Sequence, residues 1–108
     1  MHAINGTWKI LAKSNFGPMP SVDELYVNED GKTFQGVMHD EKSGKDFPIV
    51  NGIIIDEHTV TFEAAMTIGL IKMNFLMESH LSEDGMSCQG TAKAGIIKGT
   101  FEGTKIKE

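Results

Sequence analysis

Apolar and polar residues alternate along most of the chain with a period of two. Val60, Phe62 and Ala64 alternate with Thr61 and Glu63, and similar runs recur throughout the sequence. This alternation places successive side chains on opposite faces of a β-strand. No apolar stripe of helical period lasts for three turns, so the pattern predicts an all-β fold.

The alternating runs are short and are separated by turn residues. Asp30-Gly31 and Asp84-Gly85 lie between such runs and favour β-hairpins, because glycine adopts a positive φ at low cost. Tight turns of this kind make neighbouring strands antiparallel, and the segment 52–57 bridges the fourth and fifth strands. The predicted strands are residues 6–13, 21–28, 32–40, 45–52, 58–67, 70–81, 85–93 and 96–106.

The two halves of the chain resemble each other. Residues 29–36 and 83–90 both begin with Glu-Asp-Gly and end with Gln-Gly, at an offset of 54 residues in a chain of 108. Thr7-Trp8 and Thr61-Phe62 share the same offset. Each half is then a four-strand meander, and two such half-repeats can close into an eight-stranded antiparallel up-and-down β-barrel without exposed edges. A β-sandwich and a half-open sheet remain alternatives.

The alternation also assigns the two faces of the predicted sheet. One face is apolar and becomes the interior, whereas the other carries charged and amide side chains, as expected for a soluble barrel. The residues predicted to face inward are Trp8, Ile10, Ala12, Asp23, Leu25, Val27, Phe34, Gly36, Met38, Phe47, Ile49, Val60, Phe62, Ala64, Met66, Ile71, Met73, Phe75, Met77, Met86, Cys88, Gly90, Ala92, Ile97, Gly99, Phe101 and Gly103.

Strand direction divides the turns between two ends of the predicted barrel. End B holds the N-terminus and both Asp-Gly turns, and end A holds the segments 16–20, 40–45, 68–69 and 94–95. Trp8 lies near end B and can plug it, whereas inward residues toward end A are small or flexible. An eight-stranded barrel is just wide enough to be filled by side chains or to hold one small ligand.

We therefore expect a ligand cavity toward end A, with the proline-stiffened loop 16–20 as a lid. A fully packed interior is the alternative, since methionine also fills gaps in cores. The candidate ligand-binding residues are Ala12, Phe16, Met19, Met38, Ala64, Met66, Met73 and Ala92.

Gly6-Thr7-Trp8, at the start of the first strand, resembles the Gly-x-Trp signature of the calycin barrels, which include the lipocalins and avidin-type proteins. In those families the tryptophan caps the closed end and a long first loop lies at the open end. The resemblance covers these residues and the meander topology, and it implies a small apolar ligand. The chain is shorter than lipocalins, lacks their C-terminal helix and disulfides, and has a single tryptophan, so biotin binding is not implied.

Composition limits the number of domains, the cellular location and the class of partner that we expect. A chain of 108 residues fits one domain, residues 1–108, and its single cysteine cannot form an internal disulfide, which favours a cytoplasmic location. No secretory signal and no membrane-spanning apolar run occurs in the sequence. The net charge of −5 argues against nucleic acid and against anionic membrane surfaces. The expected partner is a small apolar molecule, and a homodimer is left open.

Acid–base chemistry has one candidate residue. Asp23 falls on the inward face near the mouth, where burial would raise its pKa and make it a general acid or base. The alternative is an aspartate that bonds the loop amides after the prolines. Cys88 falls mid-strand on the apolar face, where a thiol is unreactive. A nucleophile elbow, a P-loop and a dinucleotide-binding glycine motif are all missing from the sequence.

Two clusters carry metal-type ligands. His39-Asp40-Glu41 falls near end A and Asp56-Glu57-His58 near end B, so they do not combine, and neither a metal nor another cofactor is expected. The sequence thus predicts a barrel that binds a small apolar or amphipathic molecule. The alternatives are a small isomerase, cyclase or lyase that uses Asp23, and a ligand-free oligomerisation module.

Overall fold

The computed structural model describes residues 2–14, 17–18, 24–40, 44–68 and 70–107, with backbone only for residues 14, 17–18, 24–30 and 66–68. Within these ranges the chain forms β-strands joined by turns, and no helix is long and apolar enough to cross a membrane. The strands are β1 (Gly6–Ser14), β2 (Gly17–Pro18), β3 (Glu24–Asp30), β4 (Thr33–Asp40), β5 (Lys45–Asp56), β6 (Thr59–Ile68), β7 (Ile71–Leu81), β8 (Ser87–Ala94) and β9 (Ile97–Lys107).

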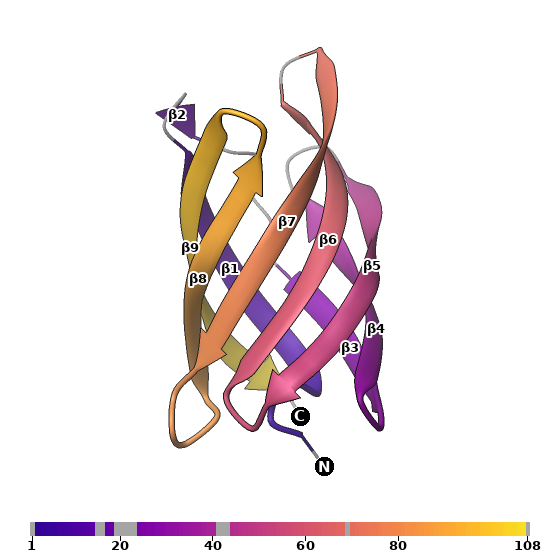
Figure 1. The fold of residues 1–108 in the computed structure, drawn as a ribbon, viewed down its shortest axis with the longest axis vertical. Helices are drawn as coiled ribbons and strands as arrows, with labels where there is room; N and C mark the ends of the chain where they lie inside the picture. Colours follow the sequence, from indigo (N-terminus) through magenta and orange to yellow (C-terminus); the bar gives the residue numbers. More distant parts are fainter. Residues whose placement is uncertain (1, 15–16, 19–23, 41–43, 69, 108) are drawn as a thin grey trace.

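All the strands belong to one antiparallel sheet with the order β2-β1-β3-β4-β5-β6-β7-β8-β9, and β9 also pairs with β1 from Thr7 to Ser14. Figure 1 shows the long strands curling around a common interior, with the N-terminus and the β3–β4, β5–β6 and β7–β8 turns at one end and the β6–β7 and β8–β9 tips at the other. The prediction of an all-β antiparallel meander is therefore confirmed. The strand count differs, because the two-residue β2 pairs with Lys13 and Ser14 and adds a ninth strand.

β5 is longer than predicted and contains a bulge. Asn51 has a positive φ of 54°, and the register with β6 shifts between Val50 and Ile53. A bulge adds one residue to one strand and moves the following side chains to the other face. As a result, Ile49 and Gly52 are both buried although they are three residues apart, so the period of two is interrupted. The strand was predicted to end at residue 52. The strand continues to Asp56.

The predicted inward face forms the hydrophobic core wherever the structure describes its side chains, apart from two residues at strand ends. Most of these residues are buried, and the others are partly buried and pack beside them. The buried apolar side chains are Ile4, Trp8, Ile10, Phe34, Met38, Ile49, Val60, Phe62, Ala64, Phe75, Met77, Leu81, Cys88, Ala92, Ala94 and Phe101.

Ile71 and Met86 were predicted to face the interior, and for both the prediction is wrong because the side chains are exposed. Ile71 pairs with Ile68 at the very tip of the β6–β7 hairpin, beyond the body of the sheet. Met86 lies in the turn before β8, where the Asp84 carboxylate accepts hydrogen bonds from its backbone N–H and from the Ser82 hydroxyl. These bonds lengthen the turn, so β8 begins at Ser87 instead of residue 85.

Candidate functional site

Trp8 closes the interior at end B, where the N-terminus lies. Its side chain is 0% exposed, and its indole Nε1–H donates a 2.9 Å hydrogen bond to the Ile4 carbonyl oxygen. A buried indole needs such a partner, because an unpaired N–H in a core is costly. Ile4 is itself buried, so the segment before β1 folds beneath the tryptophan.

Lys105 completes the closure of end B. Its ammonium group lies 5.2 Å from the centroid of a Trp8 ring and donates a hydrogen bond to the Ala3 carbonyl oxygen. The residue is only 9% exposed, and a cation held over an indole face is stabilised by the ring quadrupole. The sequence analysis overlooked Lys105, although it follows Phe101 and Gly103 on the inward parity of β9.

His2 ties the N-terminal segment to the neighbouring turn. Its Nε2 lies 2.8 Å from the Asp56 carbonyl oxygen and its Nδ1 lies 3.0 Å from the Ile4 amide nitrogen. Since the carbonyl can only accept and the amide can only donate, these contacts select the tautomer protonated at Nε2. End B is thus covered by apolar packing, by a cation and by backbone hydrogen bonds.

Burial of the interior decreases toward end A along β1, β7 and β9, whereas Met38 on β4 and Ala94 on β8 remain buried at that end. Along β9 Phe101 is buried whereas Ile97 is only partly buried, and along β7 Phe75 is buried whereas Met73 is only partly buried. Ala12, near the end of β1, is also partly exposed. The inward surface of β1, β7 and β9 therefore becomes accessible to solvent at the end opposite Trp8.

Five of the candidate ligand-binding residues can be placed with their side chains, and the structure brings them to one interior. Met38, Ala64 and Ala92 are buried within a single hydrophobic cluster, and Ala12 and Met73 pack against it. Cross-strand pairing sets Ala64 opposite both Ile49 and Phe75, and Ala92 opposite Met77 and Gly99. These small residues therefore share the concave side of the sheet with bulkier neighbours.

Phe16, Met19 and Asp23 lie outside the described residues, as does the side chain of Met66. The lid formed by residues 16–20 and the acid–base role of Asp23 stay predictions from the sequence.

Asp40 belongs to the cluster His39-Asp40-Glu41, which was considered for metal binding from the sequence. It ends β4 and is only 5% exposed. It follows Met38 by two residues, so strand parity could have placed it on the inward face, near end A. Asp40 is thus a buried carboxylate toward end A.

Cys88 and Ser79 lie close together on the inward face of β8 and β7. Both side chains are buried, and burial raises the pKa of the Cys88 thiol, while the Ser79 hydroxyl and the Gly103 backbone oppose the shift. A raised pKa keeps the sulfur protonated, and the thiolate is the reactive form. Cys88 therefore has the properties of a structural thiol, as predicted from its position on the apolar face.

The native Cys88 thiol should react with a disulfide reagent on the order of 100-fold more slowly than an exposed cysteine, because modification requires the core to open. The matched control is Gln89→Cys in a Cys88→Ala background, since Gln89 is the exposed neighbour on the same strand. The modification rates of both cysteines are measured at pH 8, in native buffer and in guanidinium. Equal native rates for the two cysteines would contradict the burial argument.

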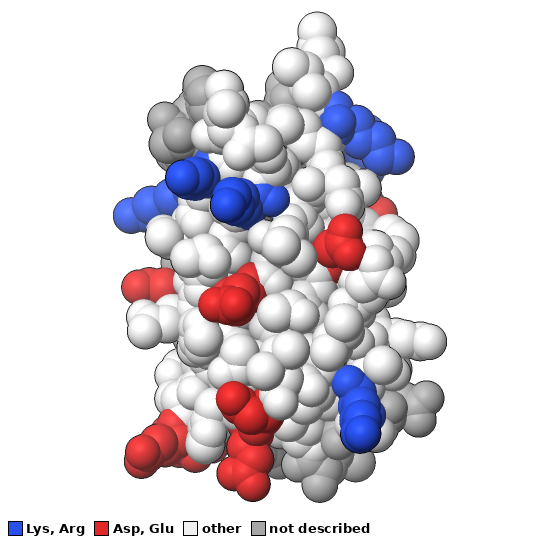
Figure 2. All heavy atoms as spheres, viewed as in Figure 1, with Lys and Arg blue, Asp and Glu red and all other residues white. Residues whose placement is uncertain are grey.

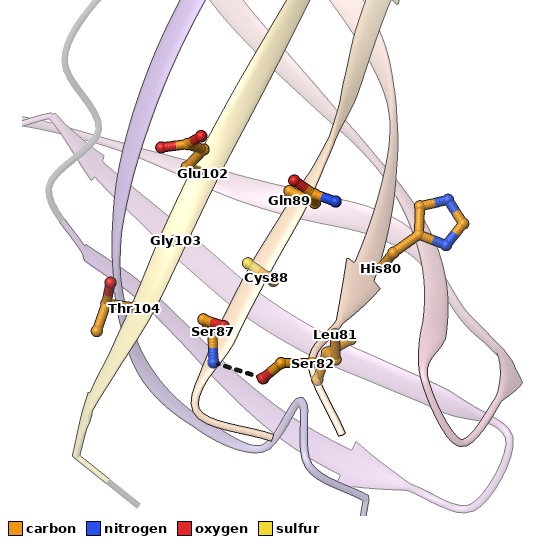
Figure 3. Close-up of a pocket in the computed structure, with 9 residues that line it drawn as sticks. All are labelled: His80, Leu81, Ser82, Ser87, Cys88, Gln89, Glu102, Gly103 and Thr104. Atoms are coloured by element: carbon orange, nitrogen blue, oxygen red, sulfur yellow. Dashed lines mark hydrogen bonds between the residues drawn. The ribbon is translucent and has the colours of Figure 1, made fainter. Parts of the chain in front are cut away.

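A depression with a volume of about 450 Å³ lies on the outer surface of β7, β8 and β9 (Figure 3). Its outward side chains are polar, and the Ser87 amide N–H donates a 3.1 Å hydrogen bond to the Ser82 hydroxyl across it. His80 contacts Glu78 at 3.0 Å, but both side chains are half exposed, and exposed ion pairs of this kind contribute little. This depression offers hydrogen bonds to a polar ligand without enclosing it.

The two clusters with metal-type ligands lie apart in the structure. His39 contacts Asp46 at 2.7 Å near end A, whereas His58 lies in the β5–β6 turn at end B, where its amide N–H donates to the Asp56 carboxylate. That hydrogen bond lowers the pKa of the exposed Asp56. Among the described residues, no group of three or more His, Cys, Asp and Glu side chains is placed to hold a metal ion.

Comparison with known proteins gives no further assignment. The chain matches no protein-family model, and no curated protein is significantly similar to it.

Proposed function

We propose that this protein binds a small apolar or amphipathic molecule in its interior, which the ligand enters from end A. The observation that carries the proposal is the burial gradient along β1, β7 and β9: Trp8 is fully buried at end B, whereas Ala12, Met73 and Ile97 are partly exposed at end A. A site with a closed base and an accessible mouth is the usual form of a ligand pocket in a small barrel.

In this proposal the eight long strands form a closed barrel, which leaves no exposed sheet edge. The pairing of β9 with β1 from Thr7 to Ser14 supports this view. The calycin resemblance is part of the same proposal, in which Trp8 is the tryptophan of the closed end. The hydrogen bond from its indole to Ile4 and the cation of Lys105 over its ring support that role.

The walls set the chemistry of the ligand. Alanine and methionine side chains offer a surface that attracts apolar groups without directional bonds, and methionine adapts its shape to different ligands. Asp40, buried near the mouth, could meet a polar head group while the tail occupies the interior. An amphipathic molecule with one polar end therefore suits this arrangement better than a uniformly polar one.

An anilinonaphthalene dye should bind the native protein at about one site per chain, with a micromolar dissociation constant, or about −8 kcal/mol. Ala64→Phe and Ala92→Phe each place a ring in the interior and should weaken dye binding at least tenfold. Each should keep the fold at an overpacking cost of about 1–3 kcal/mol or less. Fluorescence titration measures binding, and urea denaturation followed by circular dichroism measures stability.

Ala65→Phe is the matched control, because Ala65 is the neighbour of Ala64 on β6 and faces the outer surface. It should leave dye binding unchanged. Ala12→Phe tests the partly exposed mouth, where a new ring meets less packing, and it should also weaken binding. A native protein that binds no dye, together with severe destabilisation by both interior phenylalanines, would establish a packed core and refute the proposed function.

A further inference from the structure

We propose that end A docks on an anionic phospholipid surface, with the tips of two hairpins inserted among the lipids. The β6–β7 and β8–β9 hairpins both end at end A, and they are neighbours because β7 pairs with β8. In Figure 1 the β6–β7 tip projects beyond the rest of the sheet. This inference concerns the outer surface and does not depend on a ligand in the interior.

Both hairpin tips expose large aliphatic side chains. Leu70 is fully exposed, Ile71 is 63% exposed, and Ile96, at the tip of the neighbouring hairpin, is 78% exposed. Most turns carry polar residues, since apolar groups at a projecting tip gain nothing from water. Aliphatic side chains at two adjacent tips are suited to a partner that removes them from water together.

A collar of lysines lies just behind the tips, on the outward face of β1, β7, β8 and β9. Its members are Lys13, Lys72, Lys93 and Lys98, and all four are exposed. Figure 2 shows most of the blue side chains of the visible face in its upper part, below the projecting tip, and one at the lower right, while the red side chains lie below the upper blue ones. Clusters of basic residues of this kind attract anionic lipid headgroups.

Lys93 and Lys98 provide the most specific observation. They are direct cross-strand partners on β8 and β9, and like charges placed directly opposite each other destabilise a sheet. Both line a depression of about 420 Å³ together with the hydroxyl-bearing Thr91 and Thr100. A phosphate group set between two ammonium groups and two hydroxyls would turn the repulsion into attraction.

The spacing along the strands fits an interfacial depth. Lys72 and Lys98 each follow an exposed tip residue, Leu70 or Ile96, by two positions, which corresponds to about 7 Å along a strand. Apolar faces of interfacial segments enter the headgroup region by about 5–10 Å. The aliphatic tips would therefore reach the acyl boundary while the lysines remain at the level of the phosphates.

The charge distribution removes the objection that the net charge of −5 raises. Asp56, Glu57, Glu83 and Asp84 are exposed acidic residues in or next to turns at end B, whereas Asp46 is an exposed acidic residue at end A. The molecule is 38 Å long, whereas the Debye length at physiological salt is about 8 Å. A lipid surface at end A is therefore screened from the acidic end, and the net charge is a poor guide to this contact.

The direct test is sedimentation with vesicles of phosphatidylcholine, alone or mixed with an equal part of phosphatidylglycerol. The protein should bind the mixed vesicles at least tenfold more tightly than the neutral ones. Raising the ionic strength from about 0.1 M to about 1 M should abolish this preference, because the Debye length falls to about 3 Å.

Two sets of variants separate the tips from the collar. Leu70→Glu and Ile96→Glu should each reduce binding to the mixed vesicles at least tenfold, and Lys93→Gln/Lys98→Gln should reduce it about 25-fold, or about fivefold per lysine. The matched controls lie toward end B: Ile55→Glu and Ile106→Glu for the tips, and Lys32→Gln/Lys107→Gln for the collar. All of these controls change exposed residues and should leave vesicle binding unchanged.

Failure to bind mixed vesicles would overturn the proposal, as would equal losses in the end A variants and their end B controls. Sedimentation velocity without lipid tests the competing occupant, a second copy of the chain. A dimer that Leu70→Glu dissociates would assign the tips to self-association and overturn the lipid contact. Dye binding by Leu70→Glu, measured without vesicles, reports separately on the interior site.

Discussion

Trp8→Ala should lower the free energy of unfolding by about 3–5 kcal/mol, the usual loss when a large buried aromatic side chain is truncated. The indole fills the base of the interior and is fully buried. Its removal leaves a cavity, and it also deprives the Ile4 carbonyl of a donor and Lys105 of the ring beneath its charge. Since domains of this size are stable by about 5–15 kcal/mol, the loss is a large part of the total.

Urea denaturation followed by circular dichroism measures this loss, because the variant has no tryptophan to report on its own unfolding. Trp8→Phe is the control: it keeps an aromatic ring and loses the indole hydrogen bond, so it should cost about half as much. In the natural protein the Trp8 emission should be blue-shifted and weakly quenched by iodide. A solvent-like emission maximum, or a loss below about 1 kcal/mol for Trp8→Ala, would contradict the closed base.

The two faces of the sheet could be predicted from the sequence because a single rule controls them. Successive residues of a strand point to opposite sides, so an apolar interior imposes a period of two wherever the strands are regular. Phe62 and Ala64 on β6, and Phe75 and Met77 on β7, follow that rule and are buried. The same rule predicted that Ala64 and Ala92 of the candidate site face inward, and both are buried.

The exceptions depend on contacts between residues far apart in the sequence. The bulge at Asn51 could not be predicted from the sequence, because the apolar residues Ile53, Ile54 and Ile55 that follow it fit either face of the sheet. Lys105 was overlooked because lysine is rarely buried, and its burial depends on the Ala3 carbonyl and the Trp8 ring. Both features required the paired strands to be in place.

Small and flexible inward residues toward end A were predicted from the sequence, but two other features of that end were not. Phe101 is buried whereas Ile97 is only partly buried, and the period of two does not predict this difference because both residues have inward parity. Net charge likewise averages over the whole molecule, so it concealed the cross-strand pair of Lys93 and Lys98. A period of two therefore indicates which residues face inward, whereas the exposure and the local charge of each position come from the three-dimensional arrangement.

Gly90→Ala should lower the free energy of unfolding by about 3 kcal/mol, the upper part of the usual range for overpacking. Gly90 lies between Ser79 on β7 and Phe101 on β9. A Cβ atom at this position would collide with the Glu78 carbonyl oxygen and would lie 2.6 Å from Cζ of Phe101. A side chain can rotate away, but a carbonyl held in a sheet ladder cannot move without straining its hydrogen bonds.

Gly31→Ala is the matched control, because it makes the same substitution in a turn where nothing lies within 4 Å of the new Cβ. Its φ of 66° should cost about 1–2 kcal/mol through backbone conformation alone. Urea denaturation of both variants measures the difference. Gly90→Ala/Phe101→Leu should recover only part of the loss, since the smaller side chain relieves the ring contact and leaves the Glu78 carbonyl in place. If Gly90→Ala lowers the free energy of unfolding no more than Gly31→Ala does, this result would contradict the close approach of β7 and β8 at Gly90.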